Sequence, residues 1–567
     1  AKQDAPAHLS ERWAGASCLA HPTWCRMQPT ISTQGVAVKR RRRRRWLWIS
    51  LATFLLLLVI GFIYAAWPGR STFTVSPETT YVTGPLDNDG YVDYVTALNE
   101  RMRGNIKPEE NANVLLWQAL GPHPEDKTWS EEYFVWLGAP RPPENGEYFV
   151  WYKDYLEKLE KNGELDSEKR EDLVNRMYKA AVWPWLAQDE PELAEWLKRM
   201  EKPLAVAIAA TRRPKYYNPL VPQPSKDGSR GMAAFSLLPS AQACRGIGHA
   251  LACRAMLRLK DGKTEEAWQD LLACHRLGRL VARGGDLLEL LAGISIDGMA
   301  HKAVTFLYRS KLTSDEIRKC WHDLEQLPPM PTVAEKLDLT GRFGFLDTVM
   351  YLASEWPAGD DPVGGSSGPR RKSFWQNLFT RNVDFDPALR NANGWYDRLV
   401  ANARLSDRIA RKKEWDAMET ELKALKPQMD MGLAARSLFM GPRQRGEVIG
   451  NILLGMYLPA SGKLVTATER SEQVHRNRRL AFALALYHAD HGRYPEKLAE
   501  LAPKYLDTIP DDIFSGKPLI YKPNGNGYLL YSVGANGVDD GGRSFGDDPP
   551  GDDLVIRMPV PEPKVKK

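Results

Sequence analysis

The chain has 567 residues, of which 43% are hydrophobic and 26% are charged, so it is long enough for several domains and its composition excludes a disordered protein. Its formal net charge of +6 comes from the basic run Lys39–Arg45, and the chain after Arg45 is slightly acidic. A nearly neutral body gives no electrostatic reason to bind nucleic acid, so we expect no nucleic-acid partner.

The uncharged stretch from Trp46 to Trp67 is expected to form a single transmembrane helix. As a helix it would be about 33 Å long, slightly longer than the hydrocarbon core of a bilayer. Because the basic run precedes it and few cations follow, the positive-inside rule places the N-terminus in the cytoplasm. The alternative is a cleaved signal peptide, but its hydrophobic region would be shorter, and Ile63-Tyr64-Ala65 is a poor cleavage site.

Residues 1–45 are predicted to be a basic cytoplasmic tail. The first methionine is Met27, and a start there would leave a short tail directly before the basic run. Residues 1–26 are therefore expected not to be native sequence, and we assign them no structure.

Hydrophobic spacing of three and four residues predicts a helical domain over residues 70–356. Residues 121–146 hold many prolines and aromatic residues and are expected to be irregular. Around the turn Asp261–Lys263 we expect a helical hairpin that resembles the middle of a tetratricopeptide repeat, with Thr264 capping the second helix. The expected helices are 91–102, 111–120, 147–161, 167–183, 190–200, 241–260, 264 onward, 286–310, 314–326 and 333–355.

Four cysteines lie within these predicted helices: Cys244, Cys253, Cys274 and Cys320. None has the C-x-x-C spacing that is typical of zinc or redox sites. We expect buried free thiols. A Cys253–Cys274 bridge across the helical hairpin is the alternative in an oxidising compartment.

Residues 357–372 are rich in glycine, proline and serine and are expected to be a linker or loop. A helical extension over residues 373–445 follows, with helices at 395–410 and 413–425. The prediction up to this point is a mostly α-helical protein.

The next predicted element is a long helix over residues 449–490 that is interrupted at Pro459. Its apolar part, Val448–Leu458, is too short to cross a membrane. Together with the strands that follow, it is expected to form a small α+β module over residues 446–558, before a Pro/Lys-rich tail at 559–567. The module's remaining elements are expected to be a short helix at 496–502 and antiparallel strands at 519–521, 528–532 and 555–558.

Three strings of this module occur in a recognisable order: Ala485–Pro495, Ile509–Tyr521 and Tyr531–Gly542. Together they resemble the C-terminal half of the major pseudopilin of type II secretion systems. The rest of the chain resembles bacterial membrane-anchored helical proteins that carry the same module, and that likeness implies no activity. It implies a bacterial inner membrane protein with its large domain in the periplasm.

The chain departs from the pilin pattern at one point. A pilin stem helix is N-terminal and follows a processing site, whereas the stem-like helix here is internal and no such site precedes it. We therefore expect that the chain is not polymerised as a pilin and that the module serves as a folded head.

The resemblance also implies a calcium site, because the pseudopilin loop after the last hairpin strand binds calcium. Carried over by position, Asn536 stands where the family has an aspartate, Asp539 lies in the same loop, and Asp553 matches a late acidic residue. Calcium takes six to eight oxygen ligands, which an Asp-rich and Asn-rich turn can supply. The alternative is a solvated acidic loop.

Other polar groups are predicted to be structural. His488, Asp490 and His491 are expected to shape the end of the long helix rather than to bind a metal. The pairs Cys274-His275 and Cys320-x-His322 are assigned to core or surface positions. The arginines expected on solvated helix faces are Arg445, Arg476, Arg478 and Arg479.

The expected function is that of a non-enzymatic, membrane-tethered envelope protein that presents a helical scaffold and a pseudopilin-like head to protein partners. The alternative is an envelope enzyme whose active site forms between distant helices, since the sequence holds no H-E-x-x-H, Walker or G-x-G-x-x-G motif. A deep pocket with several convergent ionisable groups would favour the enzyme. Shallow grooves lined by aromatic side chains would favour the scaffold.

Overall fold

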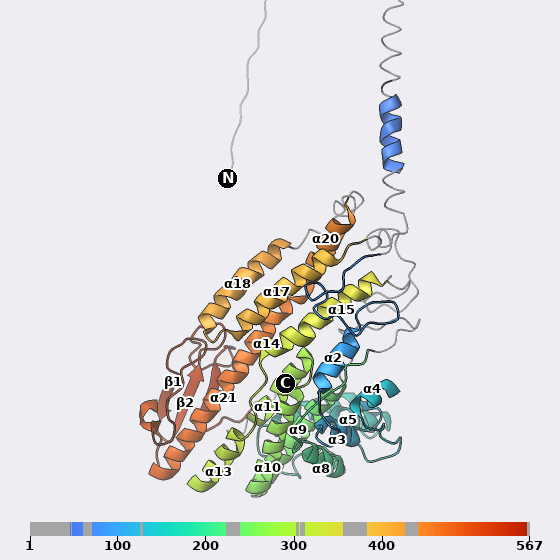
Figure 1. Ribbon diagram of the computed structural model, residues 1–567. Helices are drawn as coiled ribbons and strands as arrows, with labels where there is room; N and C mark the ends of the chain where they lie inside the picture. The colour runs from blue at the N-terminus through green and yellow to red at the C-terminus, as the bar shows by residue number, and fades with distance from the viewer. Residues whose placement is uncertain are drawn as a thin grey trace, which may run out of the picture. The chain divides into compact units, whose positions relative to one another are not determined.

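The computed structural model describes residues 46, 48–59, 71–124, 129–222, 239–301, 306, 312–354, 383–425 and 440–563. It is mostly helical and carries a three-stranded antiparallel sheet near the C-terminus, which confirms the predicted class (Figure 1). The chain divides into two compact units, Ala1–Trp67 and Pro68–Lys567, and each is treated by itself below.

In the first unit the structure describes a short apolar helix, Trp48–Val59. All of its side chains are exposed, including Trp48 at 68% and Leu57 at 61%. The predicted continuation to Trp67 lies outside the described residues.

The second unit begins with short helices, several of which carry the caps that their sequences provide. Asp93, Asn111 and Ser130 each accept a hydrogen bond from a backbone N–H in the first turn of the helix that follows. These helices are α2 (Tyr94–Arg103), α3 (Ala112–Leu120), α4 (Glu131–Leu137), α5 (Tyr152–Lys161), α6 (Ser167–Ala180), α7 (Pro191–Arg199) and α8 (Glu201–Ala210).

Two of these helices were not predicted. The α4 helix forms inside the segment expected to be irregular, because Tyr133 and Phe134 pack with Trp117 and Trp129 in a small aromatic cluster. The α8 helix contains Pro203, which is tolerated because it lies in the first turn, where no backbone N–H partner is needed.

The next helices of the second unit, most of them longer, are α9 (Pro239–Lys260), α10 (Thr264–Ala282), α11 (Leu287–His301), α13 (Ser314–Glu325), α14 (Val333–Lys336), α15 (Arg342–Ala353), α17 (Asp386–Arg404) and α18 (Arg408–Leu425). The predicted hairpin of α9 and α10 is present, but Thr264 is the first helical residue and not the cap. One π-helical turn, η3 (Leu337–Gly341), joins α14 to α15.

Helices α10 and α11 lie unusually close together because glycines stand where they cross. A Cβ atom on Gly278 would lie 2.6 Å from the backbone nitrogen of Asp297, and one on Gly293 would lie 2.5 Å from that of Ala282. Only residues without a side chain fit at these positions. This close approach sets Asp297 of α11 directly against α10.

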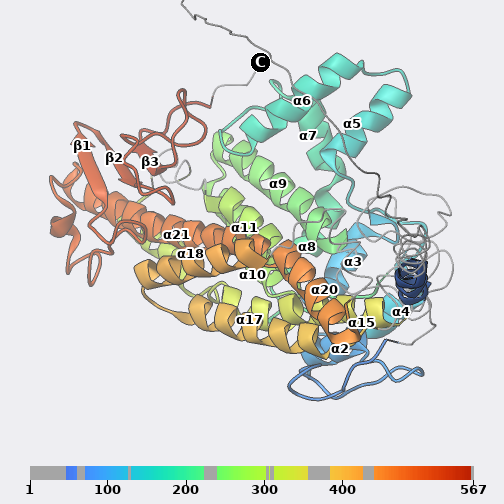
Figure 2. The ribbon, with the colours of Figure 1, turned by 90° about the horizontal axis from the view of Figure 1, so that it is seen from above.

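The C-terminal part consists of α20 (Pro442–Tyr457), α21 (Pro459–His491), the 3₁₀ turn η4 (Leu498–Leu501) and the strands β1 (Ile520–Asn524), β2 (Gly527–Ser532) and β3 (Leu554–Met558). The strands follow the order β1-β2-β3. Helix α21 contacts β2 and β3 on one side and α11 and α13 on the other. Figure 2 shows α21 running from the sheet toward α11, so this helix belongs to the module and to the body at once.

Within the described ranges, one helical stretch, Pro442–His491, is long and apolar enough by length and composition to cross a membrane. Its apolar part is partly covered by protein: Leu454 and Leu458 are fully buried, and Gly450 packs against Ala388 of α17. The predicted interruption at Pro459 is present, since α20 ends at Tyr457.

Buried polar groups correct two of the expectations. Arg445 and Arg478 are buried rather than solvated, because α20 and α21 are covered on more than one side.

The four cysteines among the described residues are buried free thiols, without the alternative Cys253–Cys274 bridge, and burial raises the pKa of each.

The predicted division of the chain beyond Pro68 stays a prediction. Most of the proposed linker, residues 357–372, lies outside the described residues, as does part of the extension at 373–445. The described parts of the helical domain, the extension and the module belong to one compact unit.

Candidate functional site

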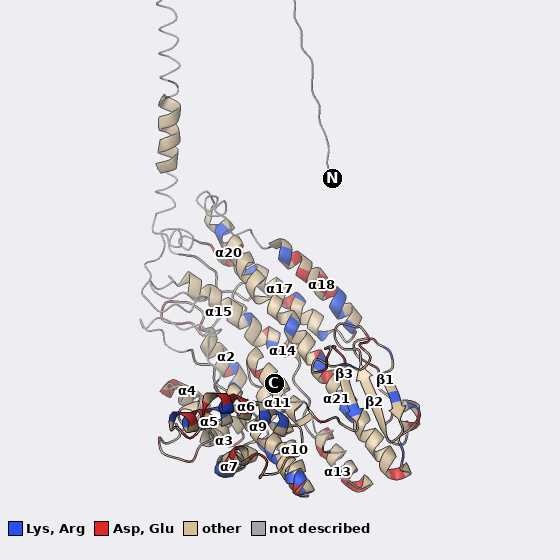
Figure 3. Ribbon diagram, turned by 180° about the vertical axis from the view of Figure 1, so that it is seen from behind, with Lys and Arg blue, Asp and Glu red and all other residues tan. Residues whose placement is uncertain are grey.

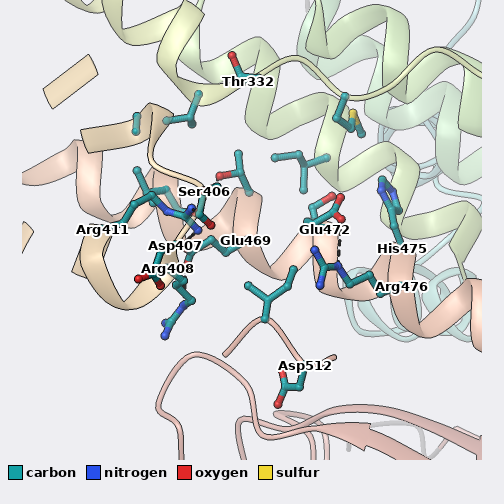
Figure 4. A pocket seen from close by; sticks show the side chains of 18 of the residues that line it. Thr332, Ser406, Asp407, Arg408, Arg411, Glu469, Glu472, His475, Arg476 and Asp512 are labelled. Atoms are coloured by element: carbon teal, nitrogen blue, oxygen red, sulfur yellow. Dashed lines mark hydrogen bonds and ion pairs between the residues drawn. The ribbon is translucent and has the colours of Figure 1, made fainter. Parts of the chain in front are cut away.

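A cleft of about 510 Å³ lies where the module meets the body. Its walls come from α21, the loop before α14, the start of α18 and the loop that follows residue 510 (Figure 4). Leu290, Ile294, Met330, Val465 and Ile513 give it an apolar component. The ionisable groups that line it are Asp407, Arg408, Arg411, Glu469, Glu472, His475, Arg476, Asp511 and Asp512.

Glu469 is the charged centre at one end of this cleft. Nε of Arg408 lies 2.9 Å from one carboxylate oxygen of Glu469, and Nη2 of Arg411 lies 2.8 Å from the other. All three side chains are largely buried. Arg408 also lies over the ring of Phe514, 4.6 Å from its centroid. These contacts join α18, whose acidic and basic residues are mixed along its length in Figure 3, to α21 and the loop after it.

The opposite wall leads to a buried carboxylate that is shared by two histidines. Oδ1 of Asp297 lies 2.8 Å from Nδ1 of His275, and Oδ2 lies 2.7 Å from Nε2 of His475. An ionised carboxylate only accepts hydrogen bonds, so each of these ring nitrogens donates. His475 lines the cleft, whereas Asp297 and His275 are fully buried.

The charges around this carboxylate determine its protonation. Burial alone would raise the pKa of Asp297, but the two imidazoles and their hydrogen bonds lower it well below its usual value. Burial lowers the pKa of His275 to about 4, and Asp297 opposes that shift. Arg279 and Arg478 lie 3.7 Å from Asp297 and 3.5 Å from His275, respectively. The group is therefore a carboxylate facing a neutral His275.

This arrangement orients His475 in the cleft wall. Because its Nε2 donates to Asp297, a neutral His475 carries its lone pair on Nδ1, as a general base requires. Ser471 lies one helical turn earlier and also lines the cleft. The described side chains of Ser471 and His475 make no hydrogen bond with each other, so a base is held in place and no nucleophile is engaged.

The predicted calcium residues lie in one loop between β2 and β3. Oδ1 of Asp539 accepts hydrogen bonds from the Tyr531 hydroxyl and the Gly541 N–H, and Oδ1 of Asn536 accepts one from the Val538 N–H. Asp553 is only 2% exposed, so the alternative of a solvated acidic loop does not hold at this residue.

Whether this loop can hold a cation depends on how its side-chain oxygen atoms are arranged and engaged. Oδ2 of Asp553 accepts the N–H of Gly542 at 2.7 Å, and burial raises its pKa. In the part of the chain that the structure describes, no group of three or more His, Cys, Asp or Glu side chains is arranged to hold a metal ion. Calcium binding at Asn536, Asp539 and Asp553 stays a prediction.

The group at the end of α21 has the structural role that was expected. Asp490 accepts hydrogen bonds from Ser314, Lys504 and Tyr505, which lower its pKa. The ring of His491 stacks on that of Tyr487 at 4.2 Å, just before the helix ends at Gly492.

Sequence reasoning missed the group around Asp297. Asp297 lies in the mostly apolar helix α11, and His275 directly follows the apolar run Leu271–Cys274 of α10. Isolated polar residues at such positions need a buried partner, which is the signal that could have identified them.

Comparison of the chain with protein-family models, with curated proteins and with solved structures gives no match.

Proposed function

We propose that the chain is a membrane-tethered, non-enzymatic envelope protein that binds a protein partner in the cleft between its helical body and its pseudopilin-like module. The observation that carries this proposal is the internal pairing of the charges in the cleft. Arg408 and Arg411 share Glu469, and Arg476 bonds to Glu472. Such pairs shape a rigid polar rim around apolar side chains, as in a recognition surface.

The exposed apolar helix Trp48–Val59 supports the tether. A run of exposed Leu, Val and Phe side chains directly after a basic segment is costly in water and suited to a bilayer. With the positive-inside rule, it favours a cytoplasmic tail and a periplasmic body. The internal position of α21, covered by the sheet and by α11, supports a folded module rather than a pilin subunit.

Site-specific photocrosslinking tests the binding role. A photoreactive amino acid at Ser406, an exposed residue of the cleft rim, should give a discrete crosslinked protein in membranes. The same residue at Lys153, exposed on α5 and away from the cleft, should not. Equal crosslinking at both positions, or none at Ser406, would contradict the proposal.

One observation favours a second function. The convergent ionisable groups of the cleft meet the criterion set for an enzyme, and the pair of His475 with Asp297 provides an oriented base beside Ser471. A fluorophosphonate reagent, which labels activated serines, separates the two proposals. The scaffold predicts no labelling. Labelling that is lost in Ser471→Ala and in His475→Ala would assign a hydrolase instead.

A further inference from the structure

A second cavity, of about 310 Å³, lies between the turn after α8, one face of α10 and the end of α13. Five arginines line it: Arg212, Arg213, Arg276, Arg279 and Arg283. A single carboxylate, Asp323, stands among the lining residues, and it accepts a hydrogen bond from Nε1 of Trp268 at 2.9 Å. The cavity is therefore strongly cationic.

Three of the arginines form a row on α10. Positions 276, 279 and 283 are three and four residues apart, so they share a face of the helix, where like charges destabilise each other. Elsewhere on α10, a carboxylate compensates the charge of nearby arginines. There Arg254 and Arg258 both bond to Asp270, at 2.6 and 2.8 Å.

Among the described residues, the cavity's arginines show an ion pair only at Arg279, whose Nε lies 3.7 Å from the carboxylate of Asp297. Within the described ranges, Arg212, Arg276 and Arg283 form no ion pair or side-chain hydrogen bond. Arg213 and Arg279 are held by backbone carbonyls: Arg213 donates to Pro108 and Asn111, and Arg279 donates to Pro328. The cavity thus combines fixed guanidinium groups with groups that are free to bind.

The pKa shifts of Arg276 and Arg283 agree with a cavity whose positive charges are not fully compensated. Burial, and then Arg212, lower the pKa of Arg276, while Asp323 acts in the opposite direction. Burial, and then Arg279, lower the pKa of Arg283. Arginine stays protonated despite such shifts, so the positive charges remain in the cavity and repel one another.

We propose that this arginine cavity binds a phosphate-type oxyanion, either a free phosphate compound or the phosphate of a lipid headgroup. Guanidinium groups bind phosphate oxygens through paired N–H donors, and several of them can surround one tetrahedral anion. A half-buried cavity strengthens these bonds relative to bulk water. This site is separate from the cleft and does not depend on its proposed role.

The test uses the full chain in an uncharged detergent, with inorganic phosphate and pyrophosphate as probes. A ligand that binds only the folded state raises the melting temperature in a saturable way. We expect such a rise with pyrophosphate, a smaller one with phosphate, and none with chloride at equal ionic strength. The same rise in chloride would reduce the effect to screening and overturn the proposal.

Paired variants locate the site. Arg276→Gln combined with Arg283→Gln should weaken pyrophosphate binding at least tenfold and leave the melting temperature without anion unchanged or higher, because repulsion is removed. Lys260→Gln, at an exposed residue of α9, is the control and should bind like the wild type. Unchanged pyrophosphate affinity in the double variant would place the anion elsewhere. If that variant does not fold, the wild-type comparison of pyrophosphate with chloride decides.

Lipid nanodiscs distinguish the two sources of phosphate. If a headgroup occupies the cavity, nanodiscs that contain phosphatidic acid should raise the apparent dissociation constant of pyrophosphate at least tenfold over its value in an uncharged detergent that carries no phosphate. An unchanged constant would assign the site to a soluble phosphate compound.

Discussion

Asp297 is a buried carboxylate whose partners come from two other helices. It accepts hydrogen bonds from His275 on α10 and His475 on α21 and lies near Arg279. Its carboxylate therefore links three segments of chain through one charge. A buried charge of this kind is stable only while its partners are present, and the partners need it equally.

Replacement of Asp297 by asparagine should lower the free energy of unfolding by about 3–5 kcal/mol, because the nearby arginines lose their counter-ion in a buried site. Denaturant unfolding of the full chain measures the change. The matched control is Asp416→Asn, whose exposed carboxylate pairs with Lys412 and which should change stability by less than about 0.5 kcal/mol. Equal effects of the two variants would rule out the proposed role of Asp297.

The pKa of His275 predicts how stability changes with pH. It is lowered to about 4 in the folded chain, against about 6.5 for an unfolded histidine. Between these values the unfolded chain binds the proton and the folded chain does not. Stability is therefore complete above about pH 6.5 and should fall by on the order of 3 kcal/mol as the pH decreases to about 4. Buried His301, whose pKa is also lowered, acts in the same direction.

Thermal melts across this pH range test the prediction in two variants. His275→Gln should reduce the pH dependence, since glutamine can still donate to Asp297 but does not titrate. His322→Gln removes an exposed histidine of α13 and should leave the wild-type profile. A profile that is identical in all three proteins would show that His275 does not titrate on unfolding.

At the scale of the elements, the crossing of α10 and α11 should not tolerate a methyl group. Gly293→Ala places a Cβ atom within 2.5 Å of the backbone nitrogen of Ala282, so the helices must separate, and stability should fall by at least about 1–3 kcal/mol. Gly298→Ala on the same helix meets nothing within 4 Å and should be neutral or stabilising by up to about 1 kcal/mol. Denaturant unfolding compares the two.

The loop between β2 and β3 is the place to test for calcium. If Asn536, Asp539 and Asp553 bind the ion, calcium should raise the melting temperature of the full chain over that in chelator. Asp539→Ala should abolish this increment with little effect in chelator, because Asp539 is exposed. Asp553→Ala should also destabilise the protein in chelator, because its buried carboxylate holds the Gly542 N–H. Identical melts with calcium and chelator would leave a purely structural loop.

At the scale of the whole molecule, the sequence predicts local structure better than contacts. Periodicity identified most of the helices, and the turn at Pro523–Gly527 identified the hairpin of β1 and β2. The seam, meaning the contact of α21 with the helical body, was not predicted. It depends on pairs such as Asp297 with His475, which lie 178 residues apart. Helical periodicity reports which face is buried and not which partner covers it. The row of arginines on α10 can be read from the sequence, but the cavity that these arginines line cannot.

The seam makes a prediction about cooperativity, because α21 packs on the body as well as on the sheet. Beyond the contact of His475 with Asp297, Phe482 packs against Trp321, and Asp490 bonds to Ser314. The module and α11 should therefore open as one unit. In native-state hydrogen exchange of the full chain, the opening free energies of α21 and α11 should agree within about 1 kcal/mol.

A variant at the seam should move both helices together. His475→Ala removes a hydrogen bond to a buried charge and should lower both opening free energies by about 1–3 kcal/mol. The control is Lys463→Ala at an exposed position of α21, which should change neither by more than about 0.5 kcal/mol. If α21 and the sheet instead exchange at a lower free energy while α11 stays protected in the wild type, the module is an independent folding unit. The cleft would then be a contact between two separable parts.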